Sequence, residues 1–144
     1  MGRQIEPARP EDLDGVLGLL TENRLPHDGL HEHLSTTVVA RQDGRIVGSA
    51  ALEMYDDGAL LRSVAVAPAL QRHQLGRELT DAAIRLAQDR GVPAIYLLTT
   101  TAEHYFPKFG FERIARADVP AGVQTSIEFT SACPSSATVM RKRL

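Results

Sequence analysis

Two stretches of the chain repeat their apolar residues with the spacing of an α-helix. The first follows Pro10, a residue typical of the first helical position, and the second ends at Gly91 and Pro93, which stop a helix. Their apolar stripes are Leu13, Val16, Leu17 and Leu20 in the first stretch, and Leu75, Leu79, Ala82 and Leu86 in the second. The pattern predicts two amphipathic helices, and we expect shorter helical segments over 102–109 and around 123–129.

Strands are predicted where runs of apolar and β-branched residues stand between turn signals. These runs cover residues 4–8, 37–41, 45–53, 59–66, 94–100, 111–115 and 138–142. Asp43-Gly44 and Asp57-Gly58 provide two-residue turns, so the strands over 37–66 follow one another as hairpins. The order strand, helix, strand from 59 to 100 forms a right-handed crossover, so we expect strands 59–66 and 94–100 to be parallel neighbours.

Length and composition indicate a single globular domain, which we expect to span residues 1–144. Hydrophobic residues make up 43% of the chain and charged residues 24%. The net charge of −2 argues against a face that neutralises nucleic-acid phosphates. No apolar run is long enough to span a membrane, and the single Cys133 suits a reducing compartment. The sequence therefore predicts a cytoplasmic protein with no nucleic acid or membrane as its partner.

The junction between strand 59–66 and the long helix is the clearest candidate for ligand binding. A strand ends, a short polar loop follows, and a helix begins at once, which gathers unsatisfied backbone N–H groups and the positive helix end at one place. Arg72, His73 and Arg77 add positive charge there. This arrangement suits a pyrophosphate, although similar junctions also serve as plain connections.

The same junction resembles the acetyl-CoA loop of the GNAT acetyltransferases. That loop follows a Val-x-Pro strand end and reads Gln/Arg-x-x-Gly-x-Gly/Ala, here Gln71-Arg72-His73-Gln74-Leu75-Gly76. Further similar motifs are Ile5-Glu6-Pro7-Ala8 with Glu11-Asp12-Leu13, Asp43-Gly44-Arg45-Ile46-Val47-Gly48, and Phe109-Gly110-Phe111. The resemblance implies an α/β (α+β) fold: a mixed, mostly antiparallel sheet of six or seven strands flanked by about four helices. Strands 59–66 and 94–100 would splay apart to form the acetyl-CoA cleft.

Within the family the chain is most similar to the arsenic-resistance branch and to the acetyltransferase domain of N-acetylglutamate synthases. The motifs that carry this likeness are Leu25-Pro26, Ala51-Leu52-Glu53, residues 59–63, residues 97–103, and the tail from Glu128-Phe129 to Ala137. The likeness implies direct acetyl transfer from acetyl-CoA to the amino group of a small amino acid or analogue, in arsenic or toxic-analogue resistance. The alternatives are a CoA-binding regulatory module with little turnover and a partner-binding domain that is not an enzyme. The sequence leaves open whether the protein forms a homodimer.

The resemblance assigns the cofactor contacts to the strand end and the loop. The pantetheine amides would pair with the backbone of Val64, Ala65 and Val66, and the pyrophosphate would lie on Gln71, Arg72, His73, Gln74, Leu75, Gly76 and Arg77. Gln74 departs from the family, which has a glycine there. Holding such a residue in an unfavourable backbone region costs about 1–3 kcal/mol. The alternative is that Gln74 has ordinary helical angles and that its side chain contacts the cofactor.

A second departure concerns the proton donor. The family's frequent catalytic tyrosine stands four residues before the Gly of Gly-Phe, where this chain has Phe106. Tyr105 is therefore the candidate acid and Phe106 a cofactor contact, although adjacent helical residues point about 100° apart. A CoA thiolate has a pKa of about 8.5, so it can also leave without a strong acid.

Glu53 and Arg62 are expected to face each other across the Asp57-Gly58 turn. One interpretation is a structural ion pair. The other is that Glu53 relays a proton from the substrate ammonium while Arg62 holds a substrate carboxylate. Thr99 lies on the splayed strand and is expected to face the bound ligands.

Three further residues favour structural interpretations. His31 and His33 are expected in a solvated loop, because no cluster of further ligands accompanies them, and no metal is expected. Cys133 before Pro134 is expected to be a small packed residue.

Overall fold

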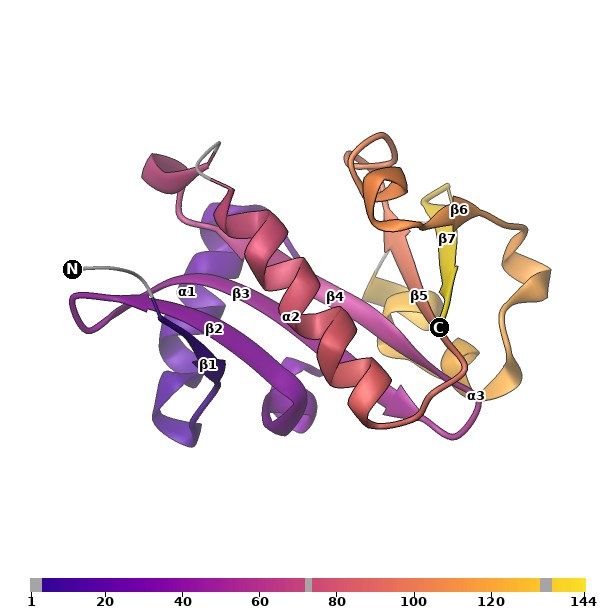
Figure 1. Cartoon of the computed structure of the whole chain (residues 1–144), viewed down its shortest axis with the longest axis horizontal. Coiled ribbons are helices and arrows are strands. Elements are labelled where there is room, and N and C mark those ends of the chain that lie inside the picture. Colours follow the sequence, from indigo (N-terminus) through magenta and orange to yellow (C-terminus); the bar gives the residue numbers. More distant parts are fainter. Residues whose placement is uncertain (1–3, 72–73, 133–135) are drawn as a thin grey trace.

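The computed structural model in Figure 1 describes residues 4–71, 74–132 and 136–144. Its strands are β1 (Gln4–Pro7), β2 (Thr37–Gln42), β3 (Arg45–Tyr55), β4 (Gly58–Val66), β5 (Ala94–Thr99), β6 (Glu112–Arg113) and β7 (Thr138–Arg143). Its α-helices are α1 (Leu13–Glu22), α2 (Leu75–Asp89) and α3 (Ala121–Gln124). Short 3-10 turns lie at Pro10–Asp12, Leu30–Thr36, Pro68–Leu70, Phe106–Phe109 and Arg116–Asp118, and a π turn lies at Glu128–Ala132. No helix of this described part is long and apolar enough to cross a membrane.

The seven strands form one sheet in the order β1-β2-β3-β4-β5-β7-β6. Every neighbouring pair is antiparallel except β4 and β5, which confirms the expected mixed sheet and its parallel pair. β5 pairs with β7 from Ala94 to Thr99, whereas its pairing with β4 is confined to Ala59–Ile95 and Leu60–Tyr96. Beyond Leu60 the two parallel strands therefore diverge (Figure 1).

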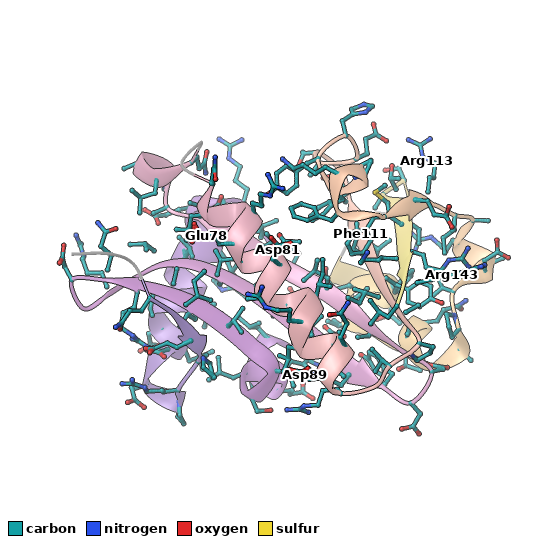
Figure 2. All side chains as sticks on the ribbon, in the orientation of Figure 1. Glu78, Asp81, Asp89, Phe111, Arg113 and Arg143 are labelled. Carbon is teal, nitrogen blue, oxygen red and sulfur yellow. The ribbon has the colours of Figure 1, made fainter. Side chains whose placement is uncertain are left out.

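The two long helices cover opposite faces of the sheet. α2 crosses in front of β2, β3 and β4 in Figure 1 and Figure 2, and α1 lies behind them. The α2 stripe of Leu75, Leu79, Ala83 and Ala87 packs in one buried cluster with Val38, Ala40, Leu52 and Leu61. Val16, Leu19 and Leu20 of α1 pack in another with Val39, Ala51 and Ala65. Because neighbouring strand residues point to opposite faces, Val38 and Val39 belong to different clusters.

A β-bulge interrupts β4 where it leaves β5. Ser49 pairs with Ala65 and Ala51 pairs with Arg62, so Ser63 and Val64 together stand opposite Ala50. Ser63 has a left-handed backbone with φ of 58°, and its carbonyl accepts a 2.7 Å hydrogen bond from the Ser49 hydroxyl. Such a backbone costs about 1–3 kcal/mol, and bulges of this kind are frequent beside active sites.

Three local expectations differ from the structure. The turn after β3 is Asp56-Asp57 rather than Asp57-Gly58, because Gly58 is a strand residue that pairs with Tyr55. A Cβ at Gly58 would lie 2.9 Å from the Tyr96 ring, so a close approach between strands requires the glycine there. The expected strand 111–115 is reduced to Glu112–Arg113, and helix 102–109 is reduced to the 3-10 turn Phe106–Phe109, since Pro107 cannot continue an α-helix.

Candidate active site

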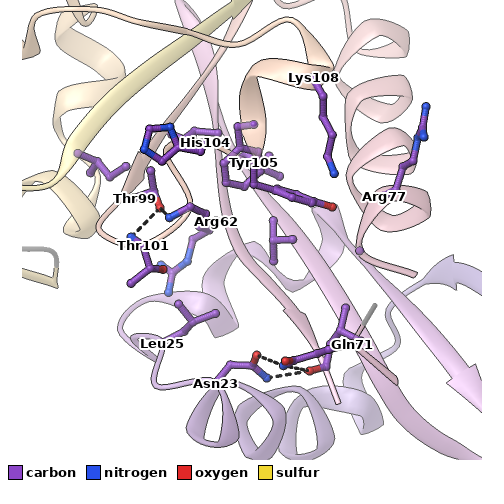
Figure 3. Close-up of a pocket in the computed structure, with 18 of the residues that line it drawn as sticks. Asn23, Leu25, Arg62, Gln71, Arg77, Thr99, Thr101, His104, Tyr105 and Lys108 are labelled. Carbon is purple, nitrogen blue, oxygen red and sulfur yellow. Dashed lines mark hydrogen bonds between the residues drawn. The ribbon is translucent and has the colours of Figure 1, made fainter. Parts of the chain in front are cut away.

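A cavity of about 950 Å³ occupies the space where β4 and β5 diverge. Its walls are the end of α1, β4 and the loop after it, the first turn of α2, and the segment from Leu97 to Lys108 (Figure 3). The cationic side chains of its lining are Arg62, Arg77 and Lys108, and the described lining contains no Asp or Glu. Since Arg77 and Lys108 are exposed, they give the mouth of the cavity a positive charge that suits an anionic ligand.

Most of the predicted cofactor residues meet at this cavity. Val64 and Val66 line it from β4, Gln71 and Gln74 from the loop, and Gly76 and Arg77 from the first turn of α2. Phe106 lines it from the opposite wall while its ring packs in the core. The Ala65 and Leu75 side chains are instead buried in the core clusters, so only their backbone could contact a ligand. Arg72 and His73 lie outside the described residues.

Gln74 is the residue that precedes α2, and its backbone is left-handed with φ of 64° and ψ of 4°. The ordinary helical backbone considered as the alternative is therefore wrong. The exposed side chain of Gln74 lines the cavity at the start of the helix. A glycine would adopt this conformation without strain, which explains the family preference at this position.

Tyr105 reaches across the cavity to the first turn of α2. A Cβ on Gly76 would lie 3.2 Å from the Tyr105 hydroxyl oxygen, so the absence of a side chain at Gly76 leaves room for the phenol. Burial raises the pKa of Tyr105, and a hydrogen bond with Thr80 opposes that rise only in part. The Lys108 ammonium lies 3.9 Å from the centre of the Tyr105 ring. Tyr105 is therefore held as a protonated hydroxyl between α2 and the opposite wall.

Glu53 and Arg62 form a buried ion pair, with Nη1 of Arg62 2.9 Å from Oε2 of Glu53. The expected register was wrong, because the turn lies one residue earlier: Glu53 pairs with Leu60, and Arg62 pairs with Ala51. The two side chains still share a face of the sheet and meet diagonally. Arg62 lines the cavity, whereas Glu53 lies behind it with 1% of its surface exposed.

Hydrogen bonds from three side chains hold Glu53 ionised. Burial raises its pKa, but hydrogen bonds from Ser126, Tyr55 and Arg62 outweigh burial and leave the pKa of Glu53 below its ordinary value. The Tyr55 hydroxyl donates to Oε1 at 2.5 Å, and Nε2 of His33 lies 3.8 Å from the same oxygen. His33, expected in a solvated loop, thus faces a buried carboxylate.

The donors of Arg62 already have acceptors within the protein. Nη1 also donates to the Asp28 carbonyl at 2.5 Å, Nη2 donates to the Pro26 carbonyl at 3.2 Å, and Nε donates to the Ser63 hydroxyl at 3.1 Å. Nη2 also lies 3.7 Å from Oε2 of Glu128. Arg62 therefore ties the loop after α1 and the bulge of β4 to Glu53, and a substrate carboxylate would compete with these acceptors.

Thr99 lines the cavity, as expected, and its hydroxyl also accepts hydrogen bonds from the backbone N–H groups of Thr101 and Ala102. Asn23, Leu25 and Lys108 were missed by the sequence reasoning although they line the cavity. Lys108 had a detectable signal, because it stands one helical turn after Tyr105. Asn23 and Leu25 had none, since only the fold brings the end of α1 beside β4.

No group of three metal-ligating side chains is found among the residues that the structure describes. Cys133, expected to be a packed residue, lies outside them.

Comparison with known proteins agrees with this geometry. The acetyltransferase (GNAT) family matches residues 6–122. An amino-acid acetyltransferase of Vibrio atlanticus is 29% identical over 126 residues, covering 81% of this chain and 28% of the relative. One of Mycobacterium tuberculosis is 33% identical over 81 residues, covering 56% of this chain and 46% of the relative. The chain thus spans less than half the length of these relatives.

Solved structures share the fold over nearly the whole chain. The N-acetylglutamate synthase of Neisseria gonorrhoeae, in complex with coenzyme A and N-acetyl-glutamate, has a TM-score of 0.84 at 22% identity, covering 100% of this chain and 35% of that one. The Mycobacterium tuberculosis protein Rv2747, in complex with CoA, has a TM-score of 0.83 at 24% identity, covering 98% of this chain and 99% of that one. The family match, which extends from β1 to α3 and includes both walls of the cavity, shows that this chain belongs to the GNAT acetyltransferase family.

Proposed function

We propose that this protein is an acetyl-CoA-dependent N-acetyltransferase that acts on the amino group of a small free amino acid or analogue. The observation that carries the proposal is the cavity between the diverging strands β4 and β5, beside the first turn of α2. The curated relatives named amino-acid acetyltransferases support the acceptor class. These relatives are longer than this chain, so amino-acid acetylation remains a proposal for the chain.

The residues present fit a CoA-like ligand. Val66 offers backbone hydrogen-bonding groups along the diverging edge of β4, and the first turn of α2 offers N–H groups that have no partner within a helix. Arg77 stands at that turn, and Lys108 stands on the opposite wall. A pantetheine arm would therefore lie along β4, with the pyrophosphate at the start of α2.

Acetyl-CoA supplies a thioester, and the chain supplies orientation and a proton. The cleft would hold the acceptor amine beside the thioester, and such positioning is worth about 7–11 kcal/mol. Tyr105 would protonate the leaving thiolate, since its hydroxyl lines the cavity and keeps its proton. Glu53 is an ionised carboxylate buried behind the cavity wall, so a proton that it takes from the substrate ammonium would have to travel through neighbouring hydroxyl groups or water, because a guanidinium such as that of Arg62 does not pass a proton on.

Several finer parts of this function are proposals as well. Resistance to arsenic or to a toxic amino-acid analogue, a cytoplasmic location, and a single domain over residues 1–144 follow from the sequence resemblance and composition. Arg62 already donates hydrogen bonds to the carbonyls of Pro26 and Asp28, which argues against a direct contact with a substrate carboxylate. These bonds favour a role in which Arg62 holds the loop after α1 in place beside the cavity.

The test is thiol release from acetyl-CoA with a panel of free amino acids, including glutamate-like compounds, alongside polyamines, aminoglycosides and peptides. We expect turnover with free amino acids. Arg77→Ala should raise the KM for acetyl-CoA, whereas Arg85→Ala on the same helix should not, since Arg85 is exposed and lies outside the cavity lining. CoA binding without turnover on any amine would instead identify a regulatory module, and turnover confined to peptides or polyamines would refute the acceptor class.

A further inference from the structure

The carbonyl of Val66 points into the cleft. The backbone N–H of Ala67 donates to the Val47 carbonyl on β3 at 2.8 Å. The C=O and N–H of one peptide group point in opposite directions, so the Val66 carbonyl faces away from β3. On that side β4 has already left β5, because their pairing is confined to Ala59–Ile95 and Leu60–Tyr96.

Two side-chain amides donate hydrogen bonds to this carbonyl. Nδ2 of Asn23 and Nε2 of Gln71 each donate to the Val66 oxygen at 3.2 Å, and Nε2 of Gln71 lies 3.2 Å from Oδ1 of Asn23 (Figure 3). A carbonyl oxygen has two lone pairs, so the two donors use its whole accepting capacity. All three residues line the cavity.

We propose that Asn23 and Gln71 stand in for an amide of the cofactor's pantetheine arm, and that binding of CoA displaces Asn23 from Val66. The inference rests on the proposed function, which places that arm along β4. A secondary amide of the arm is chemically the same kind of donor as the two side chains. It therefore competes with them for one oxygen, and Asn23 lowers the affinity of the free protein for CoA.

Asn23 can release Val66 without loss of its contact with helix α1. It is the residue that follows α1, and its Nδ2 also donates to the Leu19 carbonyl at 3.0 Å, which caps the helix. The amide nitrogen has two hydrogens, so the cap uses one and Val66 uses the other. Displacement by the cofactor therefore breaks one bond and leaves the end of α1 in place.

Calorimetric titration of CoA into wild type, Asn23→Ala and Thr21→Ala tests the inference. An intramolecular hydrogen bond contributes about 0.5–1.5 kcal/mol beyond one to water, so Asn23→Ala should bind CoA about twofold to tenfold more tightly. Thr21→Ala is the matched control, because Thr21 donates to Leu17 in the same helical turn but lies outside the cavity lining. Adenosine 3′,5′-bisphosphate, which has no pantetheine arm, should bind wild type and Asn23→Ala equally.

The outcomes separate the inference from the function on which it rests. If wild type does not bind CoA, the proposed function fails and the inference with it. If wild type binds CoA and Asn23→Ala binds it equally or more weakly, the inference alone is overturned. Independently of any variant, CoA should shift the side-chain amide NMR signals of Asn23, and adenosine 3′,5′-bisphosphate should not; unmoved signals with bound CoA also overturn it.

Discussion

Arg62 and Glu53 form their ion pair between residues that are two positions out of register on neighbouring strands. The pair is nearly fully buried, and Arg62 reaches past it to the carbonyls of Pro26 and Asp28. Two strands and the loop after α1 therefore share one guanidinium, and that loop lines the cavity at Leu25.

Arg62→Ala should lower the free energy of unfolding by about 3–5 kcal/mol, because it leaves Glu53 as a buried charge without its ion-pair partner. Urea unfolding measures the loss. The double variant Glu53→Leu with Arg62→Met should recover part of it, since the buried charge of Glu53 is then removed together with its partner. Unchanged stability together with a raised acceptor KM would instead identify Arg62 as a substrate ligand.

Gln74→Gly should tighten acetyl-CoA binding. Glycine adopts the left-handed backbone found at Gln74 without strain, and loss of the Cβ lets a phosphate approach the start of α2 more closely. Gln74→Ala is the matched control, because it shortens the side chain but keeps the Cβ. Calorimetry should show tighter binding for the glycine variant only. Weaker binding by both variants would mean that the Gln74 side chain contacts the cofactor.

Tyr105→Phe should lower kcat about a hundredfold near pH 7 and leave the acceptor KM unchanged, since that is the lower end of what general-acid catalysis contributes. The loss should shrink above about pH 8.5, where the CoA thiolate leaves without a proton. The pH profile of kcat tests this. A loss that is the same at every pH would assign Tyr105 to positioning instead.

Acid should destabilise the fold through Asp12. Hydrogen bonds from Arg41, at 2.8 and 2.9 Å, lower the pKa of Asp12 from 3.8 to about 2. A carboxyl with a lowered pKa stabilises the fold above its unfolded pKa, so this contribution of about 2 kcal/mol is lost as pH falls from about 4 through 2. The free energies of unfolding of wild type and Asp12→Asn should differ at pH 7 and become equal as the pH falls to 2. Asp14→Asn removes an exposed carboxyl in the first turn of α1, two residues after Asp12, and is the control: its free energy of unfolding should follow that of wild type at every pH.

The sequence allowed the prediction of what local pattern determines, and it failed where packing decides. The α2 helix was predicted because its apolar spacing and the stop at Gly91 are properties of a short window. The parallel β4–β5 pair followed from the handedness of crossovers. The predicted partner of Glu53 was Arg62, two residues away from its actual partner Leu60, because the turn was placed one residue too late, at Asp57-Gly58. The sequence alone does not show that Gly58 belongs to the strand, where its lack of a side chain leaves room for the Tyr96 ring.

The candidate site divides in the same way. The loop before α2 was found because its residues are consecutive. Asn23 lies 43 positions from Val66, and Arg62 lies 34 from Asp28, so no window of sequence could join them. The left-handed backbone at Gln74 was anticipated from the glycine that the family has there, which is a local property.

The extra residue at Ser63 changes which alternate residues of β4 point to each face of the sheet. Ahead of it Leu61 points toward α2 and Arg62 toward the α1 side; beyond it Ala65 points toward α1 and Val66 toward α2. If Ser63 stayed in the chain and the strand alternated strictly, Ala65 would turn to the α2 side and Val64 and Val66 to the α1 side. The bulge therefore absorbs one residue and keeps the cleft wall in its present order, and deletion of Ser63 would leave Val64 alone opposite Ala50 with Ala65 and Val66 on the faces they now have.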